Sequence, residues 1–297
     1  MSGGVEAPEQ ATVPPSPAPP PARGARIPGP VAIGVDARRF WNLTRMLSLT
    51  EFKLRFFGSA LGYLWQLMRP LMVFGVLYVV FTHVLRFSSD AKYYPVALLS
   101  GVVMFTFLSE ATTTAVTSMV EREPLVRKVQ FPRLVIPLSV VGTALLNLAL
   151  NVVVVLVFLL VSGGTPRWGW LEIPLLLALL ALFAASVATW LSALYVRYRD
   201  VKPVWDVVLQ MLFYATPIFY TLDVINNDAI EHAMLVNPLA VILQQFRHAV
   251  IDPSHPSAVA AAGSWTFLLI PAAILTLLAV GGYRYFDREA PRIAEDL

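Results

Sequence analysis

The chain lacks cysteine and is poor in charge. Its 297 residues include no Cys, and only 14% are charged while 57% are hydrophobic, with a mean hydropathy of +0.66. The absence of cysteine excludes a disulfide scaffold, thiolate metal sites and cysteine nucleophiles. Soluble domains carry about 25% charged residues, so this chain has too few to cover a water-facing surface. We therefore expect an integral membrane protein.

Motifs for nucleotide and metal binding are also missing. The sequence contains no G-x-x-x-x-G-K-[ST], no G-x-G-x-x-G and no H-E-x-x-H, and its four histidines are scattered. We therefore expect this chain to hold neither a nucleotide through these motifs nor a metal ion. Carboxylates are scarce in the apolar segments, where Glu110 and Asp206 lie inside and Glu172 lies at a border. Two such groups give little support for a proton-coupled carrier.

The first 36 residues differ from the rest of the chain. Nine of the 23 prolines lie before Val31, among Ala, Ser and Gly. Such a composition cannot bury enough apolar surface to offset the entropy lost on ordering, so residues 1–36 are predicted to be a disordered cytoplasmic tail. The segment has no apolar core of the kind that a cleaved signal peptide needs. Recruitment of a partner by the Pro-rich tail is the alternative.

Residues 37–57 are predicted to form an amphipathic interfacial helix. Apolar residues recur there at steps of three, four and seven, which places them on one helical stripe. The stripe comprises Phe40, Leu43, Leu47, Leu54 and Phe57. Basic and aromatic residues share the other faces, which suits a helix that lies in the headgroup layer and is too polar to span the bilayer. A helix packed on a soluble partner is the alternative.

Six later segments have the length of about 20 apolar residues that a bilayer requires. They are Gly62–Leu85, Tyr94–Val120, Leu134–Val161, Leu171–Val196, Val204–Leu222 and Ser264–Tyr285. The second is the least apolar, because its later half carries Glu110 among several Ser and Thr residues, so we expect it to face protein or water. The predicted fold is an all-α integral membrane protein with a six-helix transmembrane domain over residues 58–285 and a short cytoplasmic tail over residues 286–297.

Lys and Arg are distributed unevenly between the two sides of the predicted spans. Cytoplasmic loops of membrane proteins are enriched in these residues. One side carries Arg38, Arg39, Arg45, Lys53, Arg55, Arg122, Arg127, Lys128, Arg133, Arg197, Arg199, Lys202, Arg284, Arg288 and Arg292, whereas the other carries Arg86, Lys92, Arg167 and Arg247. We therefore expect both termini in the cytoplasm. The same loops explain the net charge of +3 and the pI of about 9.2 without a nucleic-acid partner.

The link between the fifth and sixth spans, Asp223 to Gly263, is long and faces outward in this topology. Within it, Ala240–Val250 is apolar but too short to cross a bilayer. Asn237 and Pro238 suit the cap and the first turn of a helix. We therefore expect short re-entrant or interfacial helices in this link.

The loop Glu121–Arg133 is short, charged and amphipathic. Pro124 suits the first turn of a helix and Pro132 suits its end. Arg127 and Lys128 fall in the final turn, where cations interact favourably with the helix dipole. The pattern is compatible with an ordinary capped loop and with a helix that docks into a groove of a soluble partner.

Four stretches in register resemble one family. The segment Leu125–Ser139 (LVRKVQFPRLVIPLS) is similar to a loop of the permease subunits of ABC transporters that export lipid-linked polysaccharides, such as O-antigen, teichoic acid and mycobacterial galactan systems. Further regions of that family are similar to FGSALGYLW at 57–65, to RYRDV at 197–201 followed by ATPIFY at 215–220, and to NPL at 237–239 with FR at 246–247. The resemblance covers about Phe40 to Tyr283.

The resemblance implies a bacterial cytoplasmic-membrane transporter driven by a separate subunit. Two permease copies and two ABC ATPase subunits would move a lipid-linked glycan, with ATP and Mg bound by the ATPase and no cofactor in this chain. The coupling helix seated in the ATPase would comprise Glu121, Arg122, Glu123, Leu125, Arg127, Lys128, Phe131 and Arg133. The gate that admits the lipid pyrophosphate would comprise Arg55, Leu61, Gly62, Tyr63, Trp65 and Arg69.

Aromatic and polar residues share one face of the first and the fifth predicted spans. The candidate channel-lining residues are Gln66, Phe74, Phe81, Asp206, Gln210, Phe213 and Tyr220. Aromatic rings stack on sugars while Gln and Asp bind hydroxyl groups, although packing inside the bundle explains the same stripes. Arg69 lies about 10 Å along its helix at 1.5 Å per residue, so it either extends to the cytoplasmic face or pairs with the pyrophosphate.

Three other functions are compatible with part of this pattern. An ABC permease of the same architecture would export a drug or a lipid through an apolar interface. A membrane glycosyltransferase or lipid phosphatase would need clustered acidic or His groups at one membrane face, which the sequence does not offer. A membrane scaffold would bind a partner without substrate-stimulated ATP hydrolysis.

Overall fold

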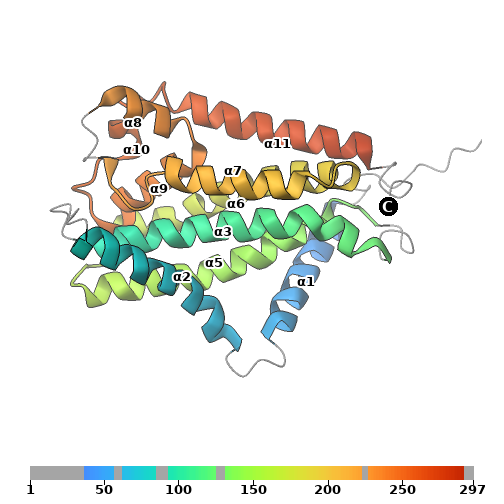
Figure 1. Cartoon of the computed structure of the whole chain (residues 1–297), viewed down its shortest axis with the longest axis horizontal. Helices are drawn as coiled ribbons and strands as arrows, with labels where there is room; N and C mark the ends of the chain where they lie inside the picture. Colours follow the sequence, from blue (N-terminus) through green and yellow to red (C-terminus); the bar gives the residue numbers. More distant parts are fainter. Residues whose placement is uncertain (1–36, 57–61, 85–92, 125–130, 223–226, 291–297) are drawn as a thin grey trace, which may run out of the picture.

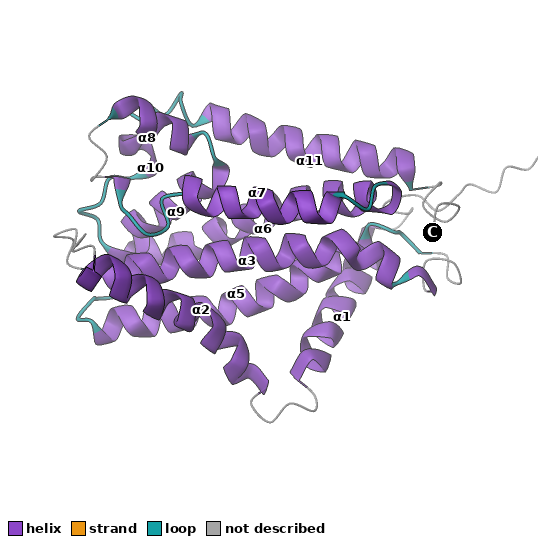
Figure 2. Cartoon of the chain, viewed as in Figure 1, coloured by secondary structure: helices purple, strands orange, loops and turns teal. Residues whose placement is uncertain are grey.

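The computed structural model describes residues 37–56, 62–84, 93–124, 131–222 and 227–290. Within these ranges the chain forms helices joined by short turns and contains no strand (Figure 2). The predicted all-α class is therefore confirmed for this part of the chain. The predicted N-terminal tail, residues 1–36, lies outside the described residues.

Several helices lie side by side and form the body of the bundle (Figure 1). They are α3 (Tyr94–Glu121), α5 (Val135–Val161), α6 (Ile173–Arg197), α7 (Val201–Ala215) and α11 (Leu269–Glu289). α3 packs against α5, α6 and α7, and α11 packs against α6. Because α3 is surrounded by the other helices, it is the most buried of the helices long enough to span a membrane.

Among the residues that the structure describes, five helices or helix pairs are long and apolar enough to cross a bilayer. They are Leu64–Val84, Tyr94–Glu121, Val135–Val161, Trp168–Arg197 and Leu269–Glu289. These five helices coincide with the first, second, third, fourth and sixth segments expected from hydropathy.

The fifth expected span differs from a continuous helix. α7 has 15 residues, which corresponds to about 22 Å at 1.5 Å per residue. It ends before Thr216, whose φ of −96° and ψ of 139° are extended. The following Pro217 disfavours the helical conformation at Thr216 and has no N–H to donate. The predicted helix over Val204–Leu222 is therefore interrupted after Ala215.

Two helices precede the bundle body. α1 (Ala37–Phe56) packs on α5, and α2 (Gly62–Val79), continued by the π-helical η1 (Val80–Val84), packs on α3. α1 and α2 diverge from the bundle in Figure 1. The helix predicted over 37–57 is confirmed for α1, and Phe57 lies outside the described residues.

The packed face of α1 agrees in part with the expected apolar stripe, since Leu43 and Leu47 pack against the cluster that contains Phe40. Phe40, Thr44 and Ser48 are buried, whereas Leu54 is 63% exposed. A Cβ atom at Gly142 of α5 would lie 3.1 Å from the Cβ of Ser48. Small residues therefore bring the two backbones together, and this close approach determines which face of α1 is buried.

Short helices gather at one end of the bundle (Figure 1). They are η2 (Trp168–Glu172), α8 (Asp228–Leu235), α9 (Pro238–Phe246), η4 (Arg247–Ile251) and α10 (Ala258–Ala261). The Asn237 side chain accepts a 3.0 Å hydrogen bond from the amide of Leu239, and Pro238 occupies the first turn of α9. This confirms the predicted helix start. Gly169 lets η2 approach η4, because a Cβ there would lie 2.1 Å from the carbonyl oxygen of Ala249.

Candidate functional site

A cavity of about 340 Å³ opens along the polar face of α3. Residues from α2, α3 and α7 line it, and we call it the α3 cavity. Its lining comprises Arg69, Val73, Val102, Phe105, Thr106, Ser109, Glu110, Thr113, Thr114 and Phe213. The hydroxyl-rich half of α3, which the sequence placed next to protein or water, therefore faces a hollow between helices.

Hydroxyl groups of α3 are compatible with the apolar bundle because they bond to their own helix. Thr106 donates to the carbonyl of Val102 at 2.7 Å, and Thr112 donates to that of Leu108 at 2.7 Å. Such bonds satisfy the hydroxyl proton without a partner from another element. The indole of Trp205 on α7 donates to the Thr112 hydroxyl at 2.9 Å. This bond ties α7 to α3 beside the α3 cavity.

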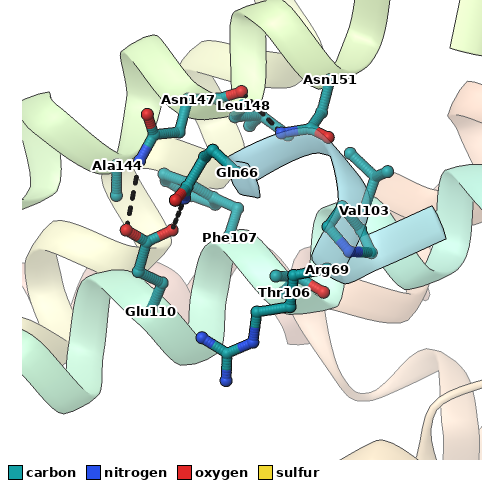
Figure 3. Close-up of a pocket in the computed structure, with 11 residues that line it drawn as sticks. Gln66, Arg69, Val103, Thr106, Phe107, Glu110, Ala144, Asn147, Leu148 and Asn151 are labelled. Atoms are coloured by element: carbon teal, nitrogen blue, oxygen red, sulfur yellow. Dashed lines mark hydrogen bonds between the residues drawn. The ribbon is translucent and has the colours of Figure 1, made fainter. Parts of the chain in front are cut away.

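Arg69 is the cation of the α3 cavity. It also lines a smaller cavity of about 20 Å³ next to Gln66 and Asn147. Its guanidinium group projects away from Asn147 and Asn151 (Figure 3). No ion pair or hydrogen bond joins Arg69 to another residue of the described ranges, and its side chain is exposed. A guanidinium group presents several donors in a plane that matches a phosphate.

Glu110 of α3 connects four helices. Its carboxylate forms an ion pair with Arg55 of α1. It accepts further hydrogen bonds from the amide of Gln66 on α2 at 3.0 Å and from that of Asn147 on α5 at 3.1 Å (Figure 3). Asn151 extends this network by donating to the carbonyl of Asn147 at 2.9 Å. The carboxylate is therefore held by three donors.

Aromatic rings meet near the ends of α2 and α7. The ring centroid of Phe219 lies 4.9 Å from that of Phe81 and 5.1 Å from that of Tyr220. Phe213 lies 5.9 Å from Phe219 and 5.0 Å from Phe105 of α3. These separations are typical of favourable aromatic pairs. The cluster continues from the α3 cavity toward the end of the bundle that carries the short helices.

The interruption after α7 leaves three consecutive carbonyl groups without helical partners. Arg247 of η4, only 1% exposed, donates to the carbonyls of Ile218 at 2.9 Å and Tyr220 at 3.1 Å. The Tyr94 hydroxyl donates to the carbonyl of Phe219 at 2.7 Å. All three carbonyls are thereby paired, which a buried irregular backbone requires.

The structure brings five of the seven predicted channel-lining residues into contacts within the bundle. Gln66 bonds to Glu110, Phe213 lines the α3 cavity, and Phe81 stacks on Phe219. The other two of the five pack elsewhere: Phe74 lies against Tyr78 and Phe158, and Tyr220 donates to the sulfur of Met234 at 3.4 Å. Asp206 and Gln210 are exposed on α7.

Only part of the predicted coupling helix can be placed. Glu121 ends α3, Arg122 caps it, and Glu123 with Pro124 begins a new helical turn. Leu125, Arg127 and Lys128 lie outside the described residues.

The last two residues of the predicted coupling helix pack against the bundle. Phe131 lies against a cluster that includes Met119 and Ile136, and Arg133 is buried. Burial lowers the pKa of Arg133, but an arginine remains charged at neutral pH. Phe131 and Arg133 therefore pack against the helical bundle, where the loop Glu121–Arg133 ends.

The predicted gate is also placed in part. Arg55 lies near the end of α1 and pairs with Glu110, while Gly62 and Tyr63 begin α2. Trp65 is 61% exposed, and Arg69 lines the α3 cavity one turn further along the helix. Leu61 lies outside the described residues.

Three residues that connect these features were not among the site residues predicted from the sequence. Glu51 of α1 forms an ion pair with Arg122, Asn147 bonds to Glu110, and Arg247 holds the end of α7. Asn147 and Arg247 carried a signal, because a polar side chain in an apolar segment indicates a partner inside the protein. Glu51 carried a weaker signal, because it lies four residues from Arg55, which has the opposite charge.

Comparison with known proteins identifies relatives along most of the chain. Residues 42–251 match the family described as ABC-2 type transporter. The O-antigen export system permease protein RfbA of Klebsiella pneumoniae is 28% identical over 86% of this chain and 95% of its own length. Its namesake from Myxococcus xanthus is 27% identical over 83% and 92%. The polysialic acid transport protein KpsM of Escherichia coli is 23% identical over 69% and 80%.

Proposed function

This chain belongs to the ABC-2 type transporter family, and we propose that it is the permease subunit of an ATP-driven exporter of lipid-linked polysaccharide. Permeases of this family work with an ABC ATPase. The matched region includes the helices that line the α3 cavity. Relatives named for O-antigen export and polysialic acid transport support a glycan as the cargo.

The observation that carries this proposal is the composition of the α3 cavity. Moving a sugar hydroxyl into an apolar medium without a hydrogen bond costs several kcal/mol, so a glycan needs a polar path. Ser109, Thr113 and Thr114 offer hydroxyl groups along one side of the cavity, and Phe105 and Phe213 offer aromatic surface. An exporter of an apolar drug or lipid would have no use for this row of hydroxyls, so the cavity favours the glycan.

We assign the diphosphate of the lipid carrier to Arg69. Its guanidinium group borders the hydroxyl-lined cavity and has no carboxylate partner among the described residues. A phosphate at this point would receive charge-assisted hydrogen bonds. The exposed start of α2, which includes Trp65, lies on the path that a lipid would take from the membrane.

The proposed topology has six crossings with both termini in the cytoplasm. Five of these crossings are the helices long enough to span a bilayer, which include α2 but not α7. The sixth consists of α7 with the irregular segment after Thr216, whose carbonyls are paired by Arg247 and Tyr94. Lys and Arg concentrate at the end of the bundle where α3, α6 and α11 finish, which supports a cytoplasmic position for that end. The short helices α8, α9 and α10 would then face outward.

The proposed transporter contains two further components, an ABC ATPase and a second copy of this chain. The segment Glu121–Arg133 would dock into the ABC ATPase, which binds ATP and Mg. A second copy of this chain would cover apolar faces of α2 and α7, where Met72, Val76, Val207 and Met211 are exposed. Only 6% of the most apolar stretch within Leu64–Val84 is buried in one copy, so α2 has surface available for such an interface.

Depletion of the protein in its source cells tests the proposed function. We expect lipid-linked glycan to accumulate on the cytoplasmic side and the polysaccharide to disappear from the cell surface. Thin-layer chromatography of extracted lipids and surface labelling measure the two pools. Export of a drug or lipid with normal surface glycan would contradict the proposal and favour the rival exporter.

A purified complex of the permease and its ATPase tests the role of Arg69. In proteoliposomes, Arg69→Gln is expected to lower the stimulation of ATP hydrolysis by lipid-linked glycan about tenfold, while Arg69→Lys retains part of it. Lys202→Gln, an exposed cation at the start of α7, is the matched control. Equal stimulation in Arg69→Gln and the wild type would remove the diphosphate assignment.

A further inference from the structure

α1 docks on the bundle along one continuous face. The Thr44 hydroxyl donates to the carbonyl of Phe40 at 2.9 Å. The Ser48 hydroxyl lies 2.9 Å from the carbonyl of Thr44 and 3.0 Å from that of Ser139 on α5. These small side chains let the two helices approach closely without an unpaired hydroxyl group. This packing holds α1 near α5, and Glu51 adds a contact of 3.5 Å with the Thr143 hydroxyl of α5.

The same face of α1 continues with two charged residues. Glu51 follows Ser48 by three positions and Arg55 follows Glu51 by four, so all three lie on one side of the helix. Glu51 forms an ion pair with Arg122 at the end of α3, and Arg55 forms one with Glu110 deeper in α3. We call Glu51–Arg122 and Arg55–Glu110 the α1–α3 ion pairs.

The signs of the α1–α3 ion pairs are opposite. An acid of α1 meets a base of α3 in one pair, and a base of α1 meets an acid of α3 in the other. A shift of α1 by one turn would move Glu51 toward Glu110 or Arg55 toward Arg122. Because like charges repel, the two pairs together select one register of α1 on α3.

Each α1–α3 ion pair also connects to a functional segment. Arg122 belongs to the proposed docking segment Glu121–Arg133 and donates to the Ser139 hydroxyl of α5 at 3.1 Å. Glu110 accepts a hydrogen bond from Gln66 at the start of α2, 3.0 Å away (Figure 3). A chain of direct contacts therefore runs from the docking segment through α1 to the start of α2, beside the α3 cavity.

The exposure of these side chains suits a connection that changes during a cycle. Glu51 and Arg122 are 23% and 24% exposed, and Arg55 is 34% exposed. Partly hydrated ion pairs break and re-form more easily than fully buried ones, whose separated charges are costly. The α1–α3 ion pairs are therefore the adjustable part of a docking face that is otherwise fixed by packing.

We propose that the α1–α3 ion pairs transmit the movement of the segment Glu121–Arg133 to α1 and to the start of α2. In this arrangement Glu51 and Glu110 are positioning residues that act through Arg122, Arg55 and Gln66. The inference rests on the proposed function, because it takes that segment as the docking site of the ATPase. It gives Glu110 a mechanical role that requires no proton transfer.

Separate measurements of ATP hydrolysis and glycan export test this inference. In proteoliposomes of the permease–ATPase complex, Glu51→Gln and Arg122→Gln should each lower the glycan exported per ATP at least fivefold while hydrolysis continues. Glu110→Gln, which keeps the size of the side chain, should act in the same direction. Arg45→Gln is the matched control, because Arg45 is exposed on another face of α1 and should leave the ratio unchanged.

Exchange of the two charges tests whether the ion pair between Glu51 and Arg122 matters, and not either residue alone. Glu51→Arg combined with Arg122→Glu re-creates an ion pair of opposite polarity and should restore at least half of the wild-type export per ATP. No recovery in the exchanged variant, or normal export in both single variants, would overturn the inference.

A disulfide reporter separates transmission from simple loss of docking. The native chain has no cysteine, so Ser48→Cys with Gly142→Cys introduces one defined pair. A Cβ at Gly142 would lie 3.1 Å from that of Ser48, which a small adjustment brings to the usual 3.5–4.5 Å of a disulfide. Continued cross-linking in the Glu51→Gln background supports transmission, whereas loss of cross-linking would show that the ion pairs only hold α1 in place.

The proposed function fails independently of this inference. If the wild-type complex exports no glycan and its ATP hydrolysis ignores lipid-linked glycan, the exporter assignment is wrong whatever Glu51 does. If the wild type exports glycan and the Glu51 variants do so equally well, only the transmission by the ion pairs is wrong.

Discussion

Arg247 holds the carbonyl of Ile218, 29 residues earlier in the chain, at 2.9 Å from its Nη2 atom. The contact joins η4 to the irregular segment that follows α7. That segment carries Phe219, the ring at which Phe81, Phe213 and Tyr220 meet. A buried cation thus determines where the aromatic cluster lies.

Replacement of Arg247 is expected to destabilise this end of the bundle. In Arg247→Met the carbonyls of Ile218 and Tyr220 lose their donors, and each buried unpaired group costs about 1–3 kcal/mol. The melting temperature of the purified protein in detergent should therefore fall markedly. Arg247→Lys should have an intermediate melting temperature, because an ammonium group cannot reproduce the planar guanidinium group that reaches both carbonyls. Arg284→Met, at an exposed position of α11, should melt like the wild type, and equal melting of Arg247→Met would contradict the assignment.

Gly282 should be required for the packing of α11. A Cβ atom there would lie 2.7 Å from Cδ1 of Trp190 on α6, whose indole donates to the carbonyl of Leu278 at 3.0 Å. Gly282→Ala therefore forces the ring or α11 to move, at a cost of about 1–3 kcal/mol. Gly75→Ala on α2 is the matched control, since no atom lies within 4 Å of its added Cβ. We expect a lower melting temperature for Gly282→Ala alone, and equal melting of both variants would contradict the packing.

The rings of Phe81 and Phe219 should be energetically coupled. They stack with centroids 4.9 Å apart, and such pairs contribute about 0.5–1.5 kcal/mol beyond their buried area. In a double-mutant cycle, Phe81→Ala with Phe219→Ala should therefore cost less stability than the two single changes added together. Phe286 lies in the cluster that contains Phe40 and Met119, so Phe286→Ala with Phe219→Ala should be additive. Additivity in the first cycle would contradict coupling between α2 and the segment after α7.

Local patterns in the sequence predicted the features that depend on neighbouring residues. Hydropathy located the five helices that are long enough to span a bilayer, because such a helix needs a continuous apolar run. Asn237 and Pro238 predicted the start of α9, since a cap and a first-turn proline act within a few residues. The helix break at Pro217 could also have been read locally. Hydropathy missed it because Thr216–Leu222 remains apolar.

Features that depend on partners far apart in the sequence could not be predicted from local patterns. Glu110 could be recognised as an unusual carboxylate inside a span, but its partners Arg55 and Asn147 lie 55 and 37 residues away. The packed face of α1 likewise depends on Gly142 of α5, whose missing side chain makes room for Ser48. No helical periodicity of α1 alone reports that neighbour. The sequence therefore predicted which types of residue form the candidate site, whereas the contacts between them became visible only in the structure.

Reversal of charge in the segment Glu121–Arg133 should weaken the docking of the ATPase and so lower glycan-stimulated ATP hydrolysis. Arg127→Glu with Lys128→Glu replaces two cations that we expect to face the ATPase, so electrostatic attraction there becomes repulsion. The variant should insert into the membrane normally but lose about tenfold or more of glycan-stimulated ATP hydrolysis, measured on purified complexes in proteoliposomes. Arg284→Glu with Arg288→Glu makes the same change in net charge at exposed positions of α11 and should hydrolyse ATP like the wild type. An equal loss in both double variants would assign the effect to overall charge, and normal stimulation in the first would show that the segment Glu121–Arg133 is not the docking site.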